Sequence, residues 1–303
     1  MTAAGKDRFD YAPRVAEALA SGGAVVALES TIVAHGFPPP DNLAVGRAME
    51  AAVAETGAVA ATIAVLDGRV KIGLGESELA RVASDPSLRK ASSRDLASLM
   101  ASGGSGATTV AATAVLAARA GIRVFATGGI GGVHRGATTD VSADLPVLAR
   151  EPVAVIASGA KIILDLPATL EMLETLGVPV IGWRTDRFPG FYCADVGLGL
   201  AQRCDDERAL ARLVSTHLDL GLGGVLIANP PPPEHALPRD RIEAWLGRAL
   251  EAAAREGVAG PATTPYLLKF LHRESAGATV ACNRALAIDN ARLGGRLARA
   301  LGG

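Results

Sequence analysis

Short apolar segments that alternate with helix-like patterns are the feature that most limits how this chain can fold. Five such runs, rich in Val, Ile and Ala, occupy residues 23–28 (GAVVAL), 122–127 (IRVFAT), 153–157 (VAVIA), 178–183 (VPVIGW) and 223–228 (GGVLIA). A continuous apolar run of this length is typical of a strand covered on both faces, as in a parallel sheet. Strands that alternate with helices predict an α/β fold of three layers, α/β/α, with a mixed, mainly parallel sheet.

The antiparallel part of this sheet is predicted from one turn. Asp67-Gly68 lies between two alternating runs in ATIAVLDGRVKIGLG, which indicates a two-residue hairpin. Helical patterns are expected at about residues 41–56 (with Asp41 as N-cap), 76–84, 94–101, 108–120 (closed by Gly121), 166–176, 207–218, 239–256, 265–272 and 281–301. No linker interrupts the pattern, so we expect residues 1–303 to form a single domain.

Composition excludes several functional classes. The net charge is −1 and the basic residues are dispersed, so the chain lacks the footprint of a protein that grips a nucleic-acid backbone. The first residues are charged, without the apolar run of a secretory signal, and no stretch is apolar for long enough to span a membrane. Cys193, Cys204 and Cys282 form no CxxC pair and are predicted to be reduced packing residues. We therefore expect a cytoplasmic protein that binds a small molecule.

Four of the predicted strands lead directly into residues capable of chemistry. Glu29 follows GAVVAL, Thr127 opens the loop GGIGGVHRG, the segment Ser158-Gly159-Ala160-Lys161 follows VAVIA, and Asn229 follows GGVLIA. Ligands of open α/β sheets gather outside the carboxyl ends of the strands. These residues are therefore predicted to converge on one site.

Lys161 is the sharpest candidate within this group. Loss of solvation at the end of a buried strand lowers the pKa of an amine and frees its lone pair for attack on an electrophilic carbon. Spacing alone also allows, and by itself favours, a lysine that reaches the surface or binds a phosphate as a point charge. Glu29 is a candidate general acid, or else a helix cap or the partner of an arginine, and His35 and His134 are candidate ligands or simply solvated.

Three further motifs leave alternatives open. Asp140 and Asp144 could supply oxygen ligands to a divalent metal, or Asp144 or Ser142 could cap a helix that begins near Leu145. The glycine cluster is not a dinucleotide fingerprint, but its backbone N–H groups could cradle a phosphate. Residues 105–109 (SGATT) are expected to begin a helix, whose free N–H groups could bind an anion or be capped.

At these same residues the chain resembles the pseudouridine-5'-phosphate glycosidase family, also called indigoidine synthase A-like, over nearly its whole length. The resemblance is carried, in order, by ALESTIVAHGFPPPDN, GAVAATIAVLDGRVKIGL, KASSRDL, GATTVAAT, IRVFATGGIGGVHRG, DVSADL, SGAKIILDLPATLEMLETLGVPVIGW, IANPPP, TPYLL and a final helix with Asn290. One departure is Thr263-Thr264-Pro265, where the family commonly has Ser-Thr-Pro.

The resemblance implies reversible cleavage of pseudouridine 5'-phosphate to uracil and ribose 5-phosphate, usually with Mn²⁺, although carboxylate sites also accept Mg²⁺. It implies Lys161 as the nucleophile that forms a Schiff base, Glu29 as the proton donor and Asp140 as the metal ligand. The implied substrate contacts are Lys90, Val110, Ser142, Ala143 and Asp144, with Thr127, His134 and Asn290 at further pocket positions. A homotrimer is also implied. The alternatives are a same-fold enzyme for another C-ribosyl phosphate and a non-catalytic sugar-phosphate binder.

Overall fold

The computed structural model describes residues 7–136, 140–258 and 263–302. Within these residues eleven strands form one mixed sheet, in the order β1-β4-β3-β2-β7-β8-β11-β9-β10, with β6 beside β3 and β5 beside β6. The strands are β1 (Phe9–Tyr11), β2 (Val25–Glu29), β3 (Val59–Leu66), β4 (Arg69–Ile72), β5 (Arg89–Ala91), β6 (Gly106–Thr108), β7 (Val124–Ala126), β8 (Ala154–Ala157), β9 (Val180–Trp183), β10 (Gln202–Cys204) and β11 (Val225–Ala228).

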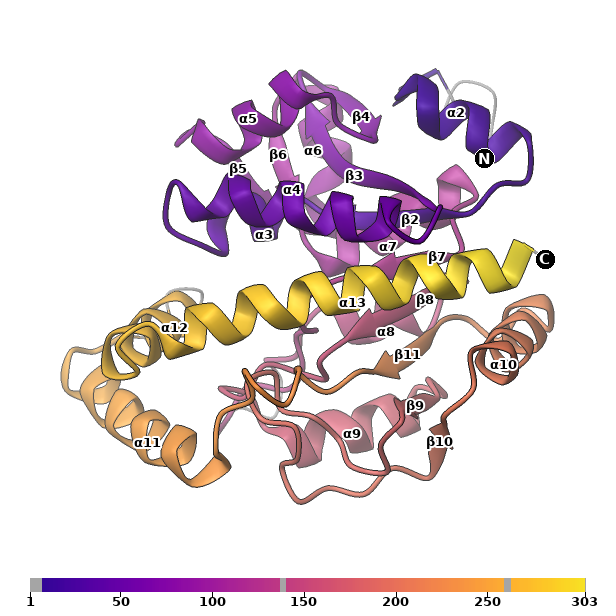
Figure 1. Cartoon of the computed structure of the whole chain (residues 1–303). Coiled ribbons are helices and arrows are strands. Elements are labelled where there is room, and N and C mark those ends of the chain that lie inside the picture. Colours follow the sequence, from indigo (N-terminus) through magenta and orange to yellow (C-terminus); the bar gives the residue numbers. More distant parts are fainter. Residues whose placement is uncertain (1–6, 137–139, 259–262, 303) are drawn as a thin grey trace.

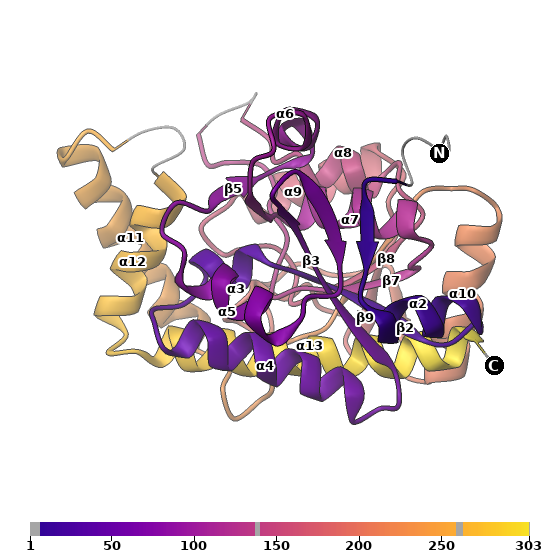
Figure 2. The same ribbon diagram turned by 90° about the horizontal axis from the view of Figure 1, so that it is seen from above.

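Helices cover both faces of this sheet, which confirms the predicted α/β/α fold (Figure 1, Figure 2). They are α2 (Pro13–Ala20), α3 (Thr31–His35), α4 (Asp41–Ala54), α5 (Glu76–Ser84), α6 (Leu96–Ala101), α7 (Val110–Ala120), α8 (Asp144–Leu148), α9 (Leu166–Thr175), α10 (Glu207–Asp219), α11 (Arg239–Arg255), α12 (Thr263–Glu274) and α13 (Ala278–Gly302), with a 3₁₀ turn at Ser93–Asp95. Figure 2 shows α4 and α13 on one side of the sheet and α6, α7, α8 and α9 on the other.

The antiparallel pairs of the sheet all involve β3. It runs antiparallel to β4 and to β6, whereas the other pairs are parallel. The predicted hairpin is confirmed: Asp67 and Gly68 both have positive φ, 52° and 76°, as a tight turn with the right-handed twist of its strands requires. β4 can therefore turn back beside β3 and offer its far edge to β1.

The central strands are fully buried, as their continuous apolar composition predicts. β2, β7, β8 and β11 expose almost nothing and carry the core of the protein. The long helix α13 lies across β2, β7 and β8, where Gly294 brings it close to Val26, Ala126 and Ile156. A side chain at this glycine would push the helix away from the sheet.

Two helix starts differ from the sequence prediction. Residues 106–108 form strand β6 instead of opening a helix, because they pair with β3 and β5; the helix begins at Val110, with Thr109 as its N-cap. Asp41 is the first residue of α4, not its cap, because Pro40 takes that position. The predicted end of α7 at Gly121 is confirmed by its left-handed conformation, φ 82°.

Cys193, Cys204 and Cys282 are free and buried, as predicted. Among the helices that the structure describes, none has the length and hydropathy needed to cross a bilayer.

Candidate active site

The loops after β7 and β8 run side by side and carry the central residues of the site. Their backbones stay paired beyond the strands: Ser158 N donates to Gly128 O (2.9 Å), Ile130 N to Gly159 O (3.0 Å) and Lys161 N to Ile130 O (3.2 Å). The glycine-rich loop therefore lies along the segment that ends in Lys161. This pairing converts two separate sequence motifs into one surface at the carboxyl edge of the sheet.

Gly159 allows the lysine-bearing loop to follow this path. Its φ is +67°, and a Cβ at this position would lie 1.8 Å from the carbonyl oxygen of Pro189. Only glycine accepts both the left-handed backbone and the close approach without strain. The position of Lys161 thus depends on a residue that has no side chain.

The amine of Lys161 is held within the site rather than in bulk solvent. Nζ donates a hydrogen bond to Gly129 O at 3.0 Å. Burial lowers the pKa of Lys161, an effect that the negative charges of Glu29 and Asp144 oppose and the positive charge of Lys90 reinforces. A neutral amine that donates an N–H to Gly129 O still has its lone pair free. The free lone pair is what nucleophilic attack requires.

Glu29 ends β2 and is buried, with 7% of its surface exposed. The hydroxyl of Thr127 donates to its Oε1. Burial raises the pKa of Glu29, although the positive charge of Lys161 and the Thr127 hydrogen bond act in the opposite direction. The two pKa values therefore shift toward a neutral amine beside a protonated carboxyl, the pairing expected of a nucleophile and a general acid.

Asp144 links the glycine loop to α7. Its Oδ1 accepts from Ala111 N at 2.9 Å and its Oδ2 accepts from Gly131 N at 2.8 Å. One oxygen of this buried carboxylate thus binds the N-terminus of α7, where the helix dipole favours a negative charge, and the other binds the glycine loop. A capping function was predicted for Asp144, but the helix it caps is α7 and not its own helix α8.

Asn290 ties three strand ends together from α13. The side chain is fully buried; Nδ2 donates to Thr127 O (2.8 Å), Gly128 O (3.3 Å) and Ser158 Oγ (3.2 Å). Its Oδ1 accepts from Nδ2 of Asn229, which also donates to Asp289. The predicted convergence of Thr127, Ser158 and Asn229 is confirmed by these contacts.

The other predicted substrate contacts surround this centre. Lys90 is an exposed residue of β5, opposite Ala107 of β6, and Val110 is the buried first residue of α7. Ser142 lies beside the glycine loop, with its N–H donating to Gly132 O, and Ala143 precedes α8. His134 Nδ1 lies 3.4 Å from Oδ2 of Asp140, whose side chain is 56% exposed.

Two hypotheses from spacing alone are not supported. For a joint metal site of Asp140 and Asp144, both oxygens of Asp144 already accept a backbone N–H group, and no three His, Cys, Asp or Glu side chains of the described residues cluster around a possible ion. In the glycine loop, part of the backbone that could cradle a phosphate is already occupied. The N–H groups of Ile130, Gly131, Val133 and His134 already donate within the protein.

Comparison with known proteins settles the family. A family model described as "Indigoidine synthase A like protein" matches residues 14–300. The chain belongs to the indigoidine synthase A-like family.

Relatives in this indigoidine synthase A-like family are similar over nearly their full length. The chain is 53% identical over 294 residues to a pseudouridine-5'-phosphate glycosidase of Jannaschia sp., covering 96% of this chain and 97% of the relative. It is 51% identical over 296 residues to the enzyme of that name from Caldanaerobacter subterraneus subsp. tengcongensis, covering 96% of each chain. The chain is therefore an enzyme of this family.

Solved structures show the same fold. The prealnumycin C-glycosynthase AlnA, in complex with ribulose 5-phosphate, superposes with a TM-score of 0.91 at 40% identity, covering 97% of both chains. An indigoidine synthase A-like protein from Thermotoga maritima superposes with a TM-score of 0.88 at 34% identity, again covering 97% of both chains.

Sequence reasoning missed parts of this indigoidine synthase A-like site. A buried chain of hydroxyls supports the loop after β2: Thr113 Oγ1 donates to Thr108 Oγ1 (2.9 Å), which donates to Ile63 O and lies 3.2 Å from Ser30 Oγ. Asp289, which holds Asn229, was also missed. The one sequence signal for Asp289 was its neighbour Asn290, a polar residue of the predicted last helix.

Proposed function

We propose that this enzyme cleaves the carbon–carbon glycosidic bond of pseudouridine 5'-phosphate with water, giving uracil and ribose 5-phosphate, in a reaction that can also run in reverse. The observation that carries the proposal is the placement of two groups at the carboxyl edge of the sheet: the Lys161 amine, which donates to Gly129 O, and the buried carboxyl of Glu29, which accepts from the Thr127 hydroxyl. Burial lowers the pKa of Lys161 and raises that of Glu29. Relatives about 50% identical over nearly the whole chain bear the name of this activity.

The first step opens the ribose ring. The bond to the base joins two carbons, so protonation of a leaving heteroatom, which suffices in ordinary nucleosides, is not available. Glu29 donates its proton to the ring oxygen as the C1'–O4' bond breaks, and the lone pair of the Lys161 amine forms a bond to C1'. One proton moves from the carboxyl group of Glu29 to O4'. The attacking amine becomes a positively charged secondary ammonium, which then gives one of its own protons to the Glu29 carboxylate.

The second step releases the base. The lone pair on the deprotonated Lys161 nitrogen forms a double bond to C1', and the electron pair of the C1'–C5 bond goes to C5 of uracil, which takes its proton from the re-protonated Glu29. This leaves an iminium between Lys161 and the open-chain sugar phosphate. Addition of water to C1' and loss of the amine then give the aldehyde of ribose 5-phosphate and restore the free lysine.

The substrate phosphate is assigned to the Lys90 side of the site. Lys90 is exposed at the edge strand β5, and its charge is close enough to act on Lys161 and Glu29. A phosphate bound there neutralises this charge. Val110, Ser142, Ala143, Asp144, Thr127, His134 and Asn290 are proposed to shape the rest of the pocket, with Thr127 and Asn290 acting through their contacts to Glu29 and the loops.

Mn²⁺, or Mg²⁺ in its place, is proposed to bind at Asp140. Ions of this kind are often held by one or two carboxylates, with water completing the shell. The side chain of Asp140 is 56% exposed, which leaves room for such waters, and His134 lies beside it. A bound ion would supply Lewis-acid polarisation of water or substrate oxygens.

The decisive experiment combines turnover with trapping. Purified enzyme, pseudouridine 5'-phosphate and Mn²⁺ should release uracil, and borohydride added during turnover should fix the sugar phosphate on Lys161, located by peptide mass spectrometry. The Lys161→Ala variant should release no uracil, whereas Lys269→Ala, which removes an exposed lysine, should retain full activity. Trapping on another lysine, or activity in Lys161→Ala, refutes the covalent mechanism.

A second candidate is an enzyme for another C-ribosyl phosphate. It is favoured by the similarity to a C-glycosynthase at 40% identity over 97% of both chains. This candidate requires the same lysine but a different base pocket. It gains support if ribose phosphate is trapped on Lys161 in the presence of Mn²⁺ while pseudouridine 5'-phosphate releases no uracil. A non-catalytic sugar-phosphate binder would give neither result.

We also propose a homotrimer, as the family resemblance implies, working in the cytoplasm without a nucleic-acid or membrane partner. Light scattering coupled to size-exclusion chromatography should give three times the mass of the chain.

A further inference from the structure

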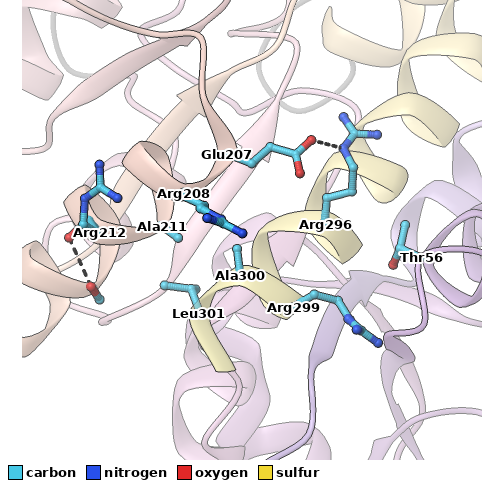
Figure 3. Close-up of a pocket in the computed structure, with 10 residues that line it drawn as sticks. Thr56, Glu207, Arg208, Ala211, Arg212, Arg296, Arg299, Ala300 and Leu301 are labelled. Atoms are coloured by element: carbon cyan, nitrogen blue, oxygen red, sulfur yellow. Dashed lines mark hydrogen bonds and ion pairs between the residues drawn. The ribbon is translucent and has the colours of Figure 1, made fainter. Parts of the chain in front are cut away.

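A second hollow lies at the opposite end of the sheet from Lys161 and Glu29. It measures about 770 Å³ and is formed by α10 and the last turns of α13 (Figure 3). Its lining consists of Thr56, Glu207, Arg208, Ala211, Arg212, Ser215, Arg296, Arg299, Ala300 and Leu301. We call it the arginine hollow.

The arginine hollow is separate from the candidate active site. Asn290 of α13 contacts the strand ends near Lys161, and Arg299 comes about 14 Å further along the same helix at 1.5 Å per residue. Arg299 lies against Gly57, just before β3 begins, which is the amino edge of the central strands. Figure 1 likewise shows α10 and the C-terminus at one end of α13 and α12 at the other.

Positive charge is concentrated in this hollow. Arg208 and Arg212 lie one turn apart on α10, and Arg296 and Arg299 lie one turn apart on α13. Among the described residues that line it, Glu207 alone is acidic, and its Oε1 lies 2.7 Å from Nε of Arg296. Among its described residues, the hollow thus combines four arginines with one glutamate, in a chain whose net charge is only −1.

Two of these arginines have no counterion of their own. Within the residues that the structure describes, no carboxylate lies within ion-pair distance of Arg208 or Arg212, and both residues are exposed. Arg299 makes only a long contact, 3.5 Å, to Gly57 O. Cations gathered without partners repel one another, and an anion placed between them removes this repulsion.

We propose that the arginine hollow binds a small anion carrying two or more phosphate groups. The guanidinium group matches phosphate oxygens through paired N–H donors, and four of them spread over two helices match several phosphates better than one. The volume falls within the range of small-molecule sites, and Ala211, Ala300 and Leu301 offer apolar contact to the rest of the ligand. The site is independent of the activity assigned to Lys161.

The test uses inorganic tripolyphosphate as the probe and isothermal titration calorimetry as the readout. All proteins carry Lys90→Ala, so that binding at the candidate phosphate position of the active site does not contribute. Arg208→Ala/Arg212→Ala should weaken binding at least tenfold. The control Arg150→Ala/Arg255→Ala removes two exposed arginines outside the hollow and should leave the affinity within twofold.

The other outcomes overturn the proposal. The proposal is wrong if the protein binds no tripolyphosphate at millimolar concentration. It is also wrong if both double variants lose affinity equally, because that result indicates a general effect of charge. A further overturning result is a change of oligomeric state in Arg208→Ala/Arg212→Ala, measured by light scattering, since this would show that a second copy of the chain fills the hollow. Circular dichroism confirms that each variant is folded.

Discussion

Replacement of Asp144 by Asn tests the central arrangement of the site. The carboxylate accepts hydrogen bonds from Ala111 N at 2.9 Å and Gly131 N at 2.8 Å, and 7% of the residue is exposed. Asparagine has nearly the same shape but only one acceptor oxygen. One backbone N–H must therefore face the new amide NH₂ group, without a partner and away from water.

The size of the effect follows from these two bonds. A hydrogen bond to a charged group contributes roughly 1.5–3 kcal/mol, and a buried N–H left without a partner costs about 1–3 kcal/mol. Allowing for the bond that Asn retains, the loss is about 3 kcal/mol. With an unfolding entropy of about 2.1 cal/mol/K per residue, a chain of 303 residues should melt about 5 °C lower.

The same substitution should move the pH profile of activity. The charge of Asp144 raises the pKa of Lys161 and of Glu29, so its removal lowers both. Since kcat/KM reports the essential acid and base of the free enzyme, both limbs of its pH profile should move to lower pH, whichever group supplies each limb. A purely structural defect would lower the rate without moving the limbs.

Thermal unfolding and kcat/KM against pH are the two assays. Asp41→Asn is the matched control, because Asp41 is an exposed residue in the first turn of α4; its melting temperature should change by about 1 °C or less. The reasoning is refuted if Asp144→Asn melts within about 1 °C of the parent, since the two buried bonds would then contribute little.

Three further predictions concern the loop, the acid and the metal. Gly159→Ala should destabilise the fold by more than about 3 kcal/mol in urea unfolding and abolish activity, because its Cβ would meet Pro189 O at 1.8 Å; Gly177→Ala, which also has positive φ but open space, should cost only about 1 kcal/mol. Glu29→Gln should lose activity yet melt at a higher temperature than the parent at pH 8. Because burial raises the pKa of Glu29, the carboxyl group contributes its full stability below pH 4.5 and loses it as the pH rises. The higher melting temperature of Glu29→Gln should therefore disappear near pH 4.5. Chelation should abolish uracil release, Mn²⁺ should restore it, and Asp140→Ala should not be restored at the same Mn²⁺ concentration; full activity in chelator refutes the proposed metal.

Much of the fold could be predicted because its signals are local. Apolar runs predicted β2, β7, β8, β9 and β11, and Asp67-Gly68 predicted the hairpin, since both signals depend on residues adjacent in the chain. The short strands β1, β5, β6 and β10 were not predicted, because three residues carry no periodicity of their own. They exist because a neighbouring strand offers unpaired backbone groups.

The residues of the candidate site likewise fall into those that the sequence could predict and those that it could not. Local pattern placed Glu29 and Lys161 at strand ends, and resemblance to a family assigned their functions. Neither the local pattern nor the resemblance could show that the carboxylate of Asp144 accepts a hydrogen bond from Ala111 N at the start of α7, since Ala111 is distant in the chain.

By itself, the sequence determined which segments are buried strands and which residues stand at their ends, because hydrophobic periodicity and turn chemistry act over a few residues. Only the tertiary structure decided which of those ends meet, which oxygens of Asp144 are already occupied, and that four arginines from two helices gather around one hollow. Burial and charge depend on neighbours brought together from distant parts of the chain. The pKa shifts of Lys161 and Glu29 are therefore properties of the fold and not of the motif.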